Sequence, residues 1–289
     1  MKYAFIERQS GSFPVQLLCR VLKVSRSGFY GWLDRAPSAR HIRNVQLVAQ
    51  IRAVHAEHRQ AYGAIKTWHT LNARGIACGK HRVARLRREN GIYAGRRRAF
   101  RPCAGRPRQA IAAPDLVRRR FRVAAPNRIW VGDMTFVRTV LGWLYVAVVL
   151  DLFSRKVIGW AMGKAANEAL ARSALDMAIA QRNPAGGLIH HTDQGTPYTA
   201  SDYRGRLAER GIFASNSGAG ACYDNAVAES FFSSMKNELV HQRRFKHPEE
   251  ARMAVFDYIE AFYNRKRIHQ SLGYKTPESI ELQYASTCP

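Results

Sequence analysis

Three acidic side chains in the C-terminal half of the chain have the type and placement needed to hold metal ions. Asp133 lies within the apolar stretch Ile129–Phe136, which is typical of a strand, and a carboxylate against a sheet core is costly unless a cation or a donor meets it. Asp193 directly follows a second apolar strand, at the end where open α/β sheets bind their ligands. Glu229 lies on a predicted helix whose apolar residues would turn its carboxylate towards the sheet.

These three carboxylates would repel one another at neutral pH, so a shared divalent cation is their natural neutraliser. Oxygen ligands favour Mg²⁺ or Mn²⁺. We expect two ions in the site, about 3.5–4 Å apart, which activate an attacking water or 3′-hydroxyl and stabilise the leaving oxygen of a phosphoryl displacement. The pattern predicts cleavage and joining of phosphodiester strands. Spacing by itself is weak support, because a chain with 21 acidic residues offers several such intervals by chance.

Other polar residues near these acids are assigned supporting roles. Asp151 ends a strand before a turn, which suits a turn-capping acid better than a metal ligand. Strand alternation places His190 and His191 on opposite faces, and His191 is the better candidate for a hydrogen bond beside the acids. Asp224 or Asn225 is expected to cap the helix of Glu229, with a DNA contact as the alternative.

The charge of the chain points to a polyanionic partner. Lys and Arg number 46 against 21 Asp and Glu, a formal net charge of +25. Such an excess indicates nucleic acid, with an acidic membrane surface as the weaker alternative. The charge is uneven, since residues 1–127 have a net charge of +22 and residues 128–289 one of +3. The N-terminal part is therefore expected to provide the electrostatic grip.

Two small all-α domains are predicted in this basic part. Apolar spacing indicates a helix-turn-helix-like segment in residues 1–38 and a second helical DNA-binding domain in residues 39–93, with helices near 41–58, 63–74 and 80–90. A packing module and a solvated basic face are the alternatives. The side chains expected to reach phosphates are Arg20, Arg26, Arg82, Arg85 and Arg88.

Residues 94–127 are predicted to be an extended linker. They are rich in proline and glycine, with ten arginines between Arg96 and Arg122 against the single acid Asp115. We expect this segment to be disordered until DNA binds. Its first arginines, Arg96, Arg97 and Arg98, are counted among the DNA-binding candidates.

Residues 128–240 show the alternation of strands and helices of an α/β catalytic core. Strands are predicted near 128–138, 143–151, 155–162, 188–192 and 212–215, and helices near 167–182, 199–210 and 224–239. Three consecutive strands followed by alternating helices and strands predict a ribonuclease H-like mixed sheet flanked by helices. A Gly-rich loop is expected at 217–221.

Residues 241–289 are predicted to be a C-terminal helical and basic tail. A helix near 248–264 would precede an irregular segment that begins with the sequence YNRKRIH. Arg265, Lys266 and Arg267, beside Tyr263 and His269, are expected to grip the DNA backbone and stack on a splayed base. A solvated helix end is an equal alternative.

Cysteine usage and hydropathy favour a cytoplasmic protein. The five cysteines are scattered without a C-x₂-C pair, which argues against a disulfide framework and a zinc site. The longest apolar run, Trp143–Leu150, is far shorter than the roughly 20 residues that a membrane span requires. No signal peptide precedes Met1. We expect a bacterial cytoplasmic location in association with the nucleoid.

Five sequence motifs, in this order, resemble the integrase-core transposases encoded by the second reading frame of bacterial insertion sequences. They are WVGDMTFV, GWLYVAVVLDLFSRKVIGWAM, LIHHTDQGTPYT, CYDNAVAESFFSSMKNEL and YNRKRIHQSLGYKTPESI, and the N-terminal LLCRVLKVSRSGFYGW is also similar. The resemblance covers nearly the whole chain. It implies that Asp133, Asp193 and Glu229 form the metal-binding triad, with thirty-five residues between the last two.

The resemblance also implies a role for Lys236, which follows Glu229 by two helical turns and would contact the DNA end near the scissile phosphate. A solvent-facing lysine is the alternative. Two departures from the family pattern stand out. The loop Ser215–Ala221 has small residues where relatives commonly carry a basic pair, which puts its DNA contacts in doubt, and the arginine usual just after Gly63 is absent.

As a function, the resemblance implies binding of the element's terminal inverted repeats and metal-dependent strand cleavage and transfer. It implies double-stranded DNA as partner, self-association into at least a dimer, and fusion to an upstream-frame protein in some relatives. A catalytically inactive or domesticated DNA-binding regulator and a plain nuclease on the same fold are the alternatives.

Overall fold

A computed structural model describes residues 1–95, 113–118, 122–218 and 225–287 of the chain. The chain forms two compact units, Met1–Gln50 and Ile51–Pro289. The division lies within helix α4, Ala39–Glu57, whereas the sequence predicted a domain boundary at residues 38–39. Among the described residues, no helix is long and apolar enough to cross a membrane.

The first unit begins with three short helices, α1 (Lys2–Gln9), α2 (Val15–Val21) and α3 (Arg26–Leu33). Ile6, Cys19 and Phe29, one from each helix, are buried together. The hydroxyl of Ser25 accepts a hydrogen bond from the Gly28 backbone N–H at 3.0 Å, so α3 starts with a serine cap. The predicted helix-turn-helix-like arrangement thus has its own small core.

The second unit opens with the end of α4, followed by α5 (Ala64–Ala73) and α6 (Lys80–Glu89). The guanidinium of Arg87 is buried and donates to the Tyr62 carbonyl and the Thr67 hydroxyl. These bonds tie α6 to the start of α5. The three helices agree with the predicted ranges to within two residues.

A five-stranded mixed sheet follows, in the order β3-β2-β1-β4-β5. Its strands are β1 (Ile129–Thr139), β2 (Gly142–Asp151), β3 (Val157–Gly163), β4 (Ile189–Thr192) and β5 (Phe213–Asn216). The first three are antiparallel neighbours, whereas β4 pairs parallel with β1 and β5 parallel with β4. This topology agrees with the predicted ribonuclease H-like core.

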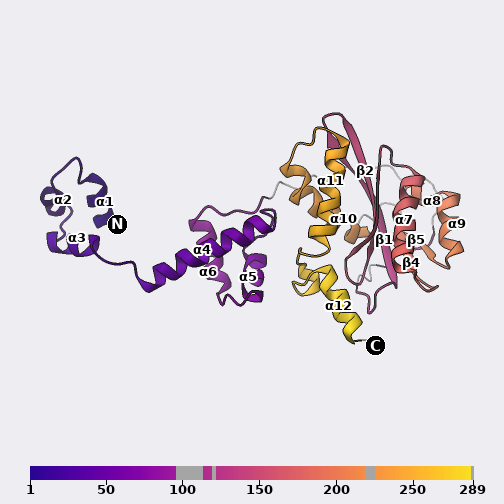
Figure 1. Cartoon of the computed structure of the whole chain (residues 1–289), viewed down its shortest axis with the longest axis horizontal. Coiled ribbons are helices and arrows are strands. Elements are labelled where there is room, and N and C mark those ends of the chain that lie inside the picture. The colour runs from indigo at the N-terminus through magenta and orange to yellow at the C-terminus, as the bar shows by residue number, and fades with distance from the viewer. Residues whose placement is uncertain (96–112, 119–121, 219–224, 288–289) are drawn as a thin grey trace. The chain divides into compact units, whose positions relative to one another are not determined.

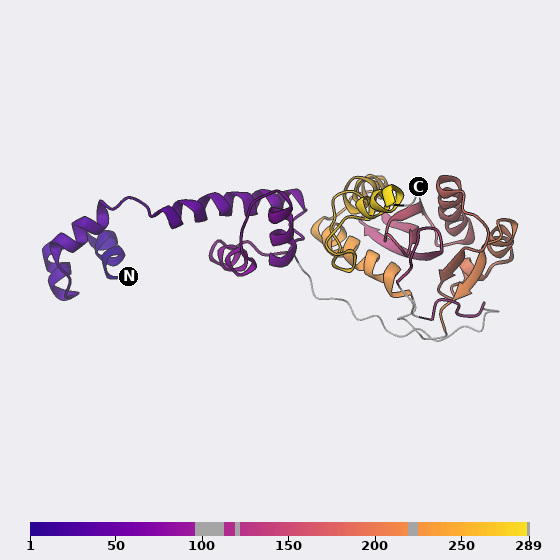
Figure 2. The ribbon, with the colours of Figure 1, turned by 90° about the horizontal axis from the view of Figure 1, so that it is seen from below.

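Helices cover both faces of the sheet (Figures 1 and 2). One face packs against α7 (Glu168–Arg182), α8 (Thr196–Thr199) and α9 (Ser201–Glu209). The other packs against α10 (Ala226–Glu238) and α11 (Pro248–Asp257). Strand alternation divides the β1 side chains between them, because Trp130 belongs to the first cluster and Val131 to the second.

Gly159 of β3 allows α7 to approach the sheet closely. A Cβ atom at this position would lie 2.2 Å from the Ala174 carbonyl oxygen and 2.8 Å from the Ala178 Cβ. Backbone atoms cannot yield as a flexible side chain does. A glycine is therefore required where β3 meets α7.

The C-terminal segment is more ordered than predicted and belongs to the core. It contains short helices at Val240–Gln242 (η2) and Gln270–Leu272 (η4), a π-helix at Tyr258–Tyr263 (η3) that continues α11, and a final helix α12 at Pro277–Thr287. Side chains of α11 and η3 share one hydrophobic cluster with β1, β2 and α10. The prediction of an irregular tail after residue 264 is wrong, because η4 and α12 are helical and Glu281 of α12 forms ion pairs with Lys156 and Arg182.

Most of the predicted linker lies outside the described residues, as does the larger part of the Gly-rich loop, so the expectation of disorder stays a prediction. The described end of the linker contacts β5. The Ala113 N–H donates to Asn216 Oδ1 at 2.8 Å, and the Leu116 N–H donates to the Ser215 hydroxyl at 3.0 Å. Val117 is 1% exposed. This part of the linker packs on the edge of the sheet.

Candidate active site

Strand register places Asp133 and Asp193 side by side. In the parallel pairing of β1 with β4, Val131 lies opposite His191. Asp133 lies two residues further along β1 and Asp193 two residues beyond His191, so both carboxylates lie just past this pairing, and Asp193 affects the pKa of Asp133. Asp193 lies one residue past the end of β4, and its Oδ1 accepts a hydrogen bond from the Gly195 N–H at 3.0 Å. The turn after β4 therefore holds this carboxylate.

Helix α10 carries Glu229 over the same face. The Asn225 side chain, immediately before the helix, is 5% exposed, and its Nδ2 donates to the Gly132 carbonyl at 3.1 Å. This bond anchors the start of α10 beside Asp133, and Glu229 follows in the first turn. Asn225 occupies the N-cap position without a side-chain cap bond, so the capping role predicted for it is wrong. Asp224 lies outside the described residues.

The three acids are electrostatically coupled at Asp133. The pKa of Asp133 is raised to about 7, mainly by burial, then by the nearby Asp193, and to a smaller extent by Glu229. The Met134 N–H, at 2.7 Å from Asp133 Oδ1, opposes this shift. Loss of hydration also raises the pKa of Asp193 and of Glu229, although both residues are exposed. The site thus disfavours three negative charges.

This donor set suits a hard divalent cation. Carboxylate oxygens from two adjacent strands and a facing helix are the ligands that Mg²⁺ and Mn²⁺ prefer. Asp133, with its raised pKa, is a carboxylate whose ionised form a cation would stabilise. Within the described ranges, no three His, Cys, Asp or Glu side chains already lie in ligand geometry. The residues fit the ions by chemistry, while the closed arrangement of three ligands is not preformed.

Lys236 is a cation whose charge affects the pKa of Asp133. It is half-buried near the end of α10, and its Nζ lies 5.2 Å from the centre of the Phe136 ring. Burial lowers the pKa of Lys236, whereas Asp133 opposes that shift. The lysine therefore lies within electrostatic reach of the acids, as expected from its position two turns after Glu229.

The two histidines before Asp193 make separate contacts. His191 Nδ1 lies 2.8 Å from the Ser215 hydroxyl and 3.9 Å from Asp115 Oδ1 of the linker. His190 Nε2 lies 2.8 Å from the Tyr203 hydroxyl, and burial lowers the pKa of His190 to about 3. These bonds hold β4 to β5 and α9. The role of His191 beside the acids stays a prediction.

Asp151 is confirmed as a turn-capping acid. It is fully buried. Its Oδ2 accepts from the Asn127 N–H at 2.7 Å, and its Oδ1 accepts from the Phe153 N–H at 2.8 Å. Both oxygens are therefore used to hold the ends of β1 and β2 in place.

Tyr198 of α8 lies within electrostatic reach of Asp133, although the sequence analysis did not single it out. Its side chain is 6% exposed, and burial followed by the charge of Asp133 raises its pKa well above the usual value. Asp193 has a smaller effect of the same sign. The only signal in the sequence was its place in the motif LIHHTDQGTPYT, since a tyrosine near an apolar strand is otherwise unremarkable.

The predicted DNA-contacting residues fall into three groups. Arg20, Arg26, Arg88, Arg265 and Lys266 are exposed, as a phosphate contact requires. Arg82 and Arg85 are half-buried, and Arg85 forms an ion pair with Glu89 at 2.8 Å. Arg96, Arg97 and Arg98 lie outside the described residues.

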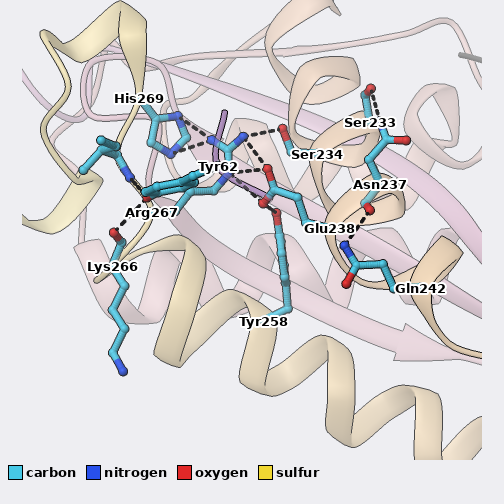
Figure 3. A network of polar contacts seen from close by, with 11 residues as sticks. Tyr62, Ser233, Ser234, Asn237, Glu238, Gln242, Tyr258, Lys266, Arg267 and His269 are labelled. Atoms are coloured by element: carbon cyan, nitrogen blue, oxygen red, sulfur yellow. Dashed lines mark hydrogen bonds and ion pairs between the residues drawn. The ribbon is translucent and has the colours of Figure 1, made fainter. Parts of the chain in front are cut away.

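The prediction that Arg267 contacts the DNA backbone is wrong, because its side chain lies in the interior (Figure 3). It is 8% exposed, and its guanidinium donates to both carboxylate oxygens of Glu238, at 2.8 Å each, and to the Ser234 hydroxyl at 2.9 Å. Tyr258 also donates to Glu238 at 2.8 Å. Arg267 of this basic run is buried, because Glu238 of α10 neutralises its charge.

Comparison with protein families identifies domains of the same kinds. An Integrase core domain model matches residues 123–222, a second Integrase core domain model matches residues 210–277, and an HTH-like domain model matches residues 43–100. The two core matches together extend from the end of the linker to η4. They include the C-terminal segment that completes the hydrophobic core.

Two curated proteins are similar over nearly their whole length. The transposase InsF for insertion sequence IS3A of Escherichia coli (strain K12) is 40% identical over 283 residues, which cover 97% of this chain and 98% of that protein. An uncharacterized 31 kDa protein of insertion element IS600 from Shigella sonnei is 39% identical over 267 residues, covering 92% and 98%.

Solved structures give more distant similarity. The catalytic core domain of HTLV-2 integrase, determined in complex with magnesium, is 20% identical with a TM-score of 0.42 and covers 55% of this chain and 99% of that one. A simian T-cell lymphotropic virus intasome in complex with a PP2A regulatory subunit gives 16% identity and a TM-score of 0.46, covering 80% and 74%.

Proposed function

Because this chain belongs to the integrase-core transposases of bacterial insertion sequences, we propose that it cuts and joins DNA strands at the ends of its own element, using Asp133, Asp193 and Glu229. The observation that carries this proposal is the coupling of the three acids at Asp133, whose pKa is raised to about 7 first by burial and then by Asp193. A half-buried, poorly hydrated carboxylate with acidic neighbours is a poor structural element. It is a good ligand for a cation.

Asp133, Asp193 and Glu229 would hold two Mg²⁺ or Mn²⁺ ions. When bound, such ions supply an activated water or 3′-hydroxyl and stabilise the leaving oxygen of a phosphoryl displacement. The chain itself positions the ligands. Asn225 fixes the start of α10 on the Gly132 carbonyl, and the turn at Gly195 fixes Asp193.

Lys236 is proposed to contact a phosphate at the DNA end. It lies on α10 with Glu229, and Asp133 affects its pKa, which supports a position of its ammonium group near the acids. A cation there would draw the scissile strand towards the carboxylates and would add a phosphate contact.

The exposed arginines of the N-terminal helices are proposed to bind the terminal repeats. Arg20 and Arg26 serve the first unit, and Arg88 of α6 serves the second, with the half-buried Arg82 beside it on the same helix. Joining two element ends requires at least two protomers, so we propose that the active form is a dimer or larger and that the protein works in the bacterial cytoplasm on nucleoid DNA. Fusion to an upstream-frame protein remains part of this proposal.

The test is a strand-joining assay on labelled element ends with Mg²⁺ or Mn²⁺. Asp133→Asn and Glu229→Gln should lose cleavage and joining while retaining DNA binding. Matched controls are Asp202→Asn and Glu209→Gln on the exposed side of α9, which should keep wild-type activity. Joining that persists in Asp133→Asn would refute the assignment. Specific binding without metal-dependent joining would favour the inactive regulator, and cleavage without transfer would favour a plain nuclease.

A further inference from the structure

A polar pocket lies along α10, on the side that bears Ser230 and Ser234. Its volume is about 590 Å³, and its lining comes from α5, α10, the turn after β2 and the segment 267–271. The residues important here are Lys66, Arg155, Ser230, Ser234, Arg267 and Gln270. Asp133, Asp193 and Glu229 are not among the lining residues, so this α10 pocket is separate from the acidic site, although Ser230 directly follows Glu229 in the chain.

The α10 pocket carries an excess of positive charge. Lys66, Arg155 and Arg267 line it, and none of the described lining residues is acidic. Arg267 is neutralised from behind by Glu238, at 2.8 Å (Figure 3). His269 stays neutral, since burial lowers its pKa to about 2. The charge that a ligand would meet therefore comes mainly from Lys66.

Lys66 is a partly dehydrated cation that has no ion-pair partner among the described residues. It is half-buried, and its Nζ lies 5.1 Å from the centre of the Tyr62 ring. No carboxylate among the described residues lies within ion-pair distance of it, because the nearest charge effects come from Arg267 and from the already paired Glu238. Burial, followed by Arg267, lowers the pKa of Lys66 to about 8. An anion in the pocket would restore what the ammonium group has lost in hydration.

The neutral groups of the pocket suit a phosphate. Ser230, Ser234, Gln270 and Ser271 provide hydroxyl and amide donors. Phosphate oxygens are bound in proteins by this combination of cations, hydroxyls and amides. The pocket is polar on several sides, which is unlike the apolar lining that small-molecule sites usually have.

We propose that the α10 pocket binds a backbone phosphate of the element's DNA, with Lys66 as the principal cation. The site spans α5 of the helical domain and α10 of the catalytic core, so one bound phosphate would couple the DNA-binding helices to the helix of Glu229. The proposal rests on the proposed function in taking DNA as the ligand. It adds a DNA-positioning site distinct from the metal-binding acids.

The experiment measures binding of the full chain to a duplex carrying the element end, in EDTA, over a range of salt concentrations. Each phosphate contact contributes about 0.9 to the slope of log K against log salt. Lys66→Met should lower this slope by about 0.9, which is about a 3- to 4-fold smaller loss of affinity between 50 and 200 mM salt. Lys66→Arg should restore it.

The matched control is Lys164→Met, which removes one exposed charge just after the edge strand β3 and outside the pocket. It should keep the wild-type slope. A second pair of variants guards against misfolding. Ser230→Asp places a carboxylate on an exposed position of the pocket and should weaken binding at low salt, whereas Ser173→Asp on α7, also exposed, should leave it nearly unchanged.

An unchanged slope in Lys66→Met, or an equal reduction in Lys164→Met, would overturn the proposal. Displacement of DNA by micromolar inorganic phosphate that requires Lys66 would identify a free-phosphate site instead and would also overturn it. Because binding is measured without metal, the outcome is independent of strand joining. If the protein joins DNA strands but Lys66→Met leaves the salt slope of DNA binding unchanged, only the α10 pocket proposal is rejected. If DNA binding depends on Lys66 but no strands are joined, only the proposed catalysis is rejected.

Discussion

Removing the carboxylate of Glu238 should destabilise the second unit strongly, because it leaves Arg267 charged and buried. The two side chains are 9% and 8% exposed. Burial by itself would lower the pKa of Arg267, but Glu238 together with Tyr258 and Tyr263 more than offsets this effect and the pKa is raised, so the guanidinium stays ionised. Glu238→Gln keeps the shape of the side chain and removes the charge that Arg267 requires.

The expected cost follows from the bonds that are lost. Glu238 accepts from Arg267 Nε and Nη2 and from the Tyr258 hydroxyl. Breaking a buried ion pair from one side costs about 3–5 kcal/mol. At about 2–4 °C per kcal/mol for a unit of this size, the unfolding midpoint should fall by at least about 6 °C. Glu238→Leu combined with Arg267→Met should cost less than the sum of the single changes, since the pair is removed together.

The assay is thermal and urea unfolding of Glu238→Gln and of a double-mutant cycle made of Glu238→Leu, Arg267→Met and the variant that combines these two changes. Glu209→Gln is the control, because it breaks the exposed pair of Arg206 with Glu209, and such pairs contribute about 0–1 kcal/mol. If Glu238→Gln cost no more than Glu209→Gln, or if the double variant were additive, the description of Arg267 as a core residue would be refuted.

Three further outcomes are expected. Gly159→Ala should destabilise the protein by about 1–3 kcal/mol, since the new Cβ would lie 2.2 Å from the Ala174 carbonyl oxygen. The control is Gly205→Ala within α9, which has open space around it and should be neutral or stabilising by about 0.5–1 kcal/mol. Chemical unfolding measures both changes. DNA affinity should fall as pH rises from 7 to 9, because Lys66 loses its proton near pH 8 and a bound phosphate favours the protonated form. Arg267 stays charged and His269 stays neutral in that range. A Lys66→Met variant whose DNA affinity had the same pH dependence would exclude Lys66 as its source. Asp151→Ala should lower stability by about 1–3 kcal/mol, as it leaves the part-buried N–H groups of Asn127 and Phe153 without their acceptor. An unfolding free energy within about 0.5 kcal/mol of wild type would contradict this reasoning.

The helices and strands of the core were predictable because their signals are local. The apolar alternation around Asp133 and the apolar run that follows place β1 and β2 within one residue of their observed bounds. The capping role of Asp151 was also predictable, since a turn after a strand leaves nearby N–H groups for an acid to accept. Such features depend on residues a few positions apart.

The buried arginine and the C-terminal helices were not predictable in this way. The run from Arg265 to Arg267 looks uniformly exposed, yet Arg267 meets Glu238, which lies twenty-nine residues earlier in the chain. Asn225 was predicted to cap its own helix, but its amide donates to Gly132 on β1. In both cases a partner distant in sequence outcompetes the local interaction.

The residue types that can bind metal and the motifs that name the family are properties of the sequence, and so are the basic charge and most element bounds. Their convergence is decided by the fold: the parallel pairing of β1 with β4 aligns Asp133 with Asp193, and the packing of α10 on that face brings Glu229 near them. The α10 pocket likewise exists only because α5 and the segment after η3 meet α10. Electrostatic coupling depends on distance in space, and distance between residues far apart in the chain is set by packing.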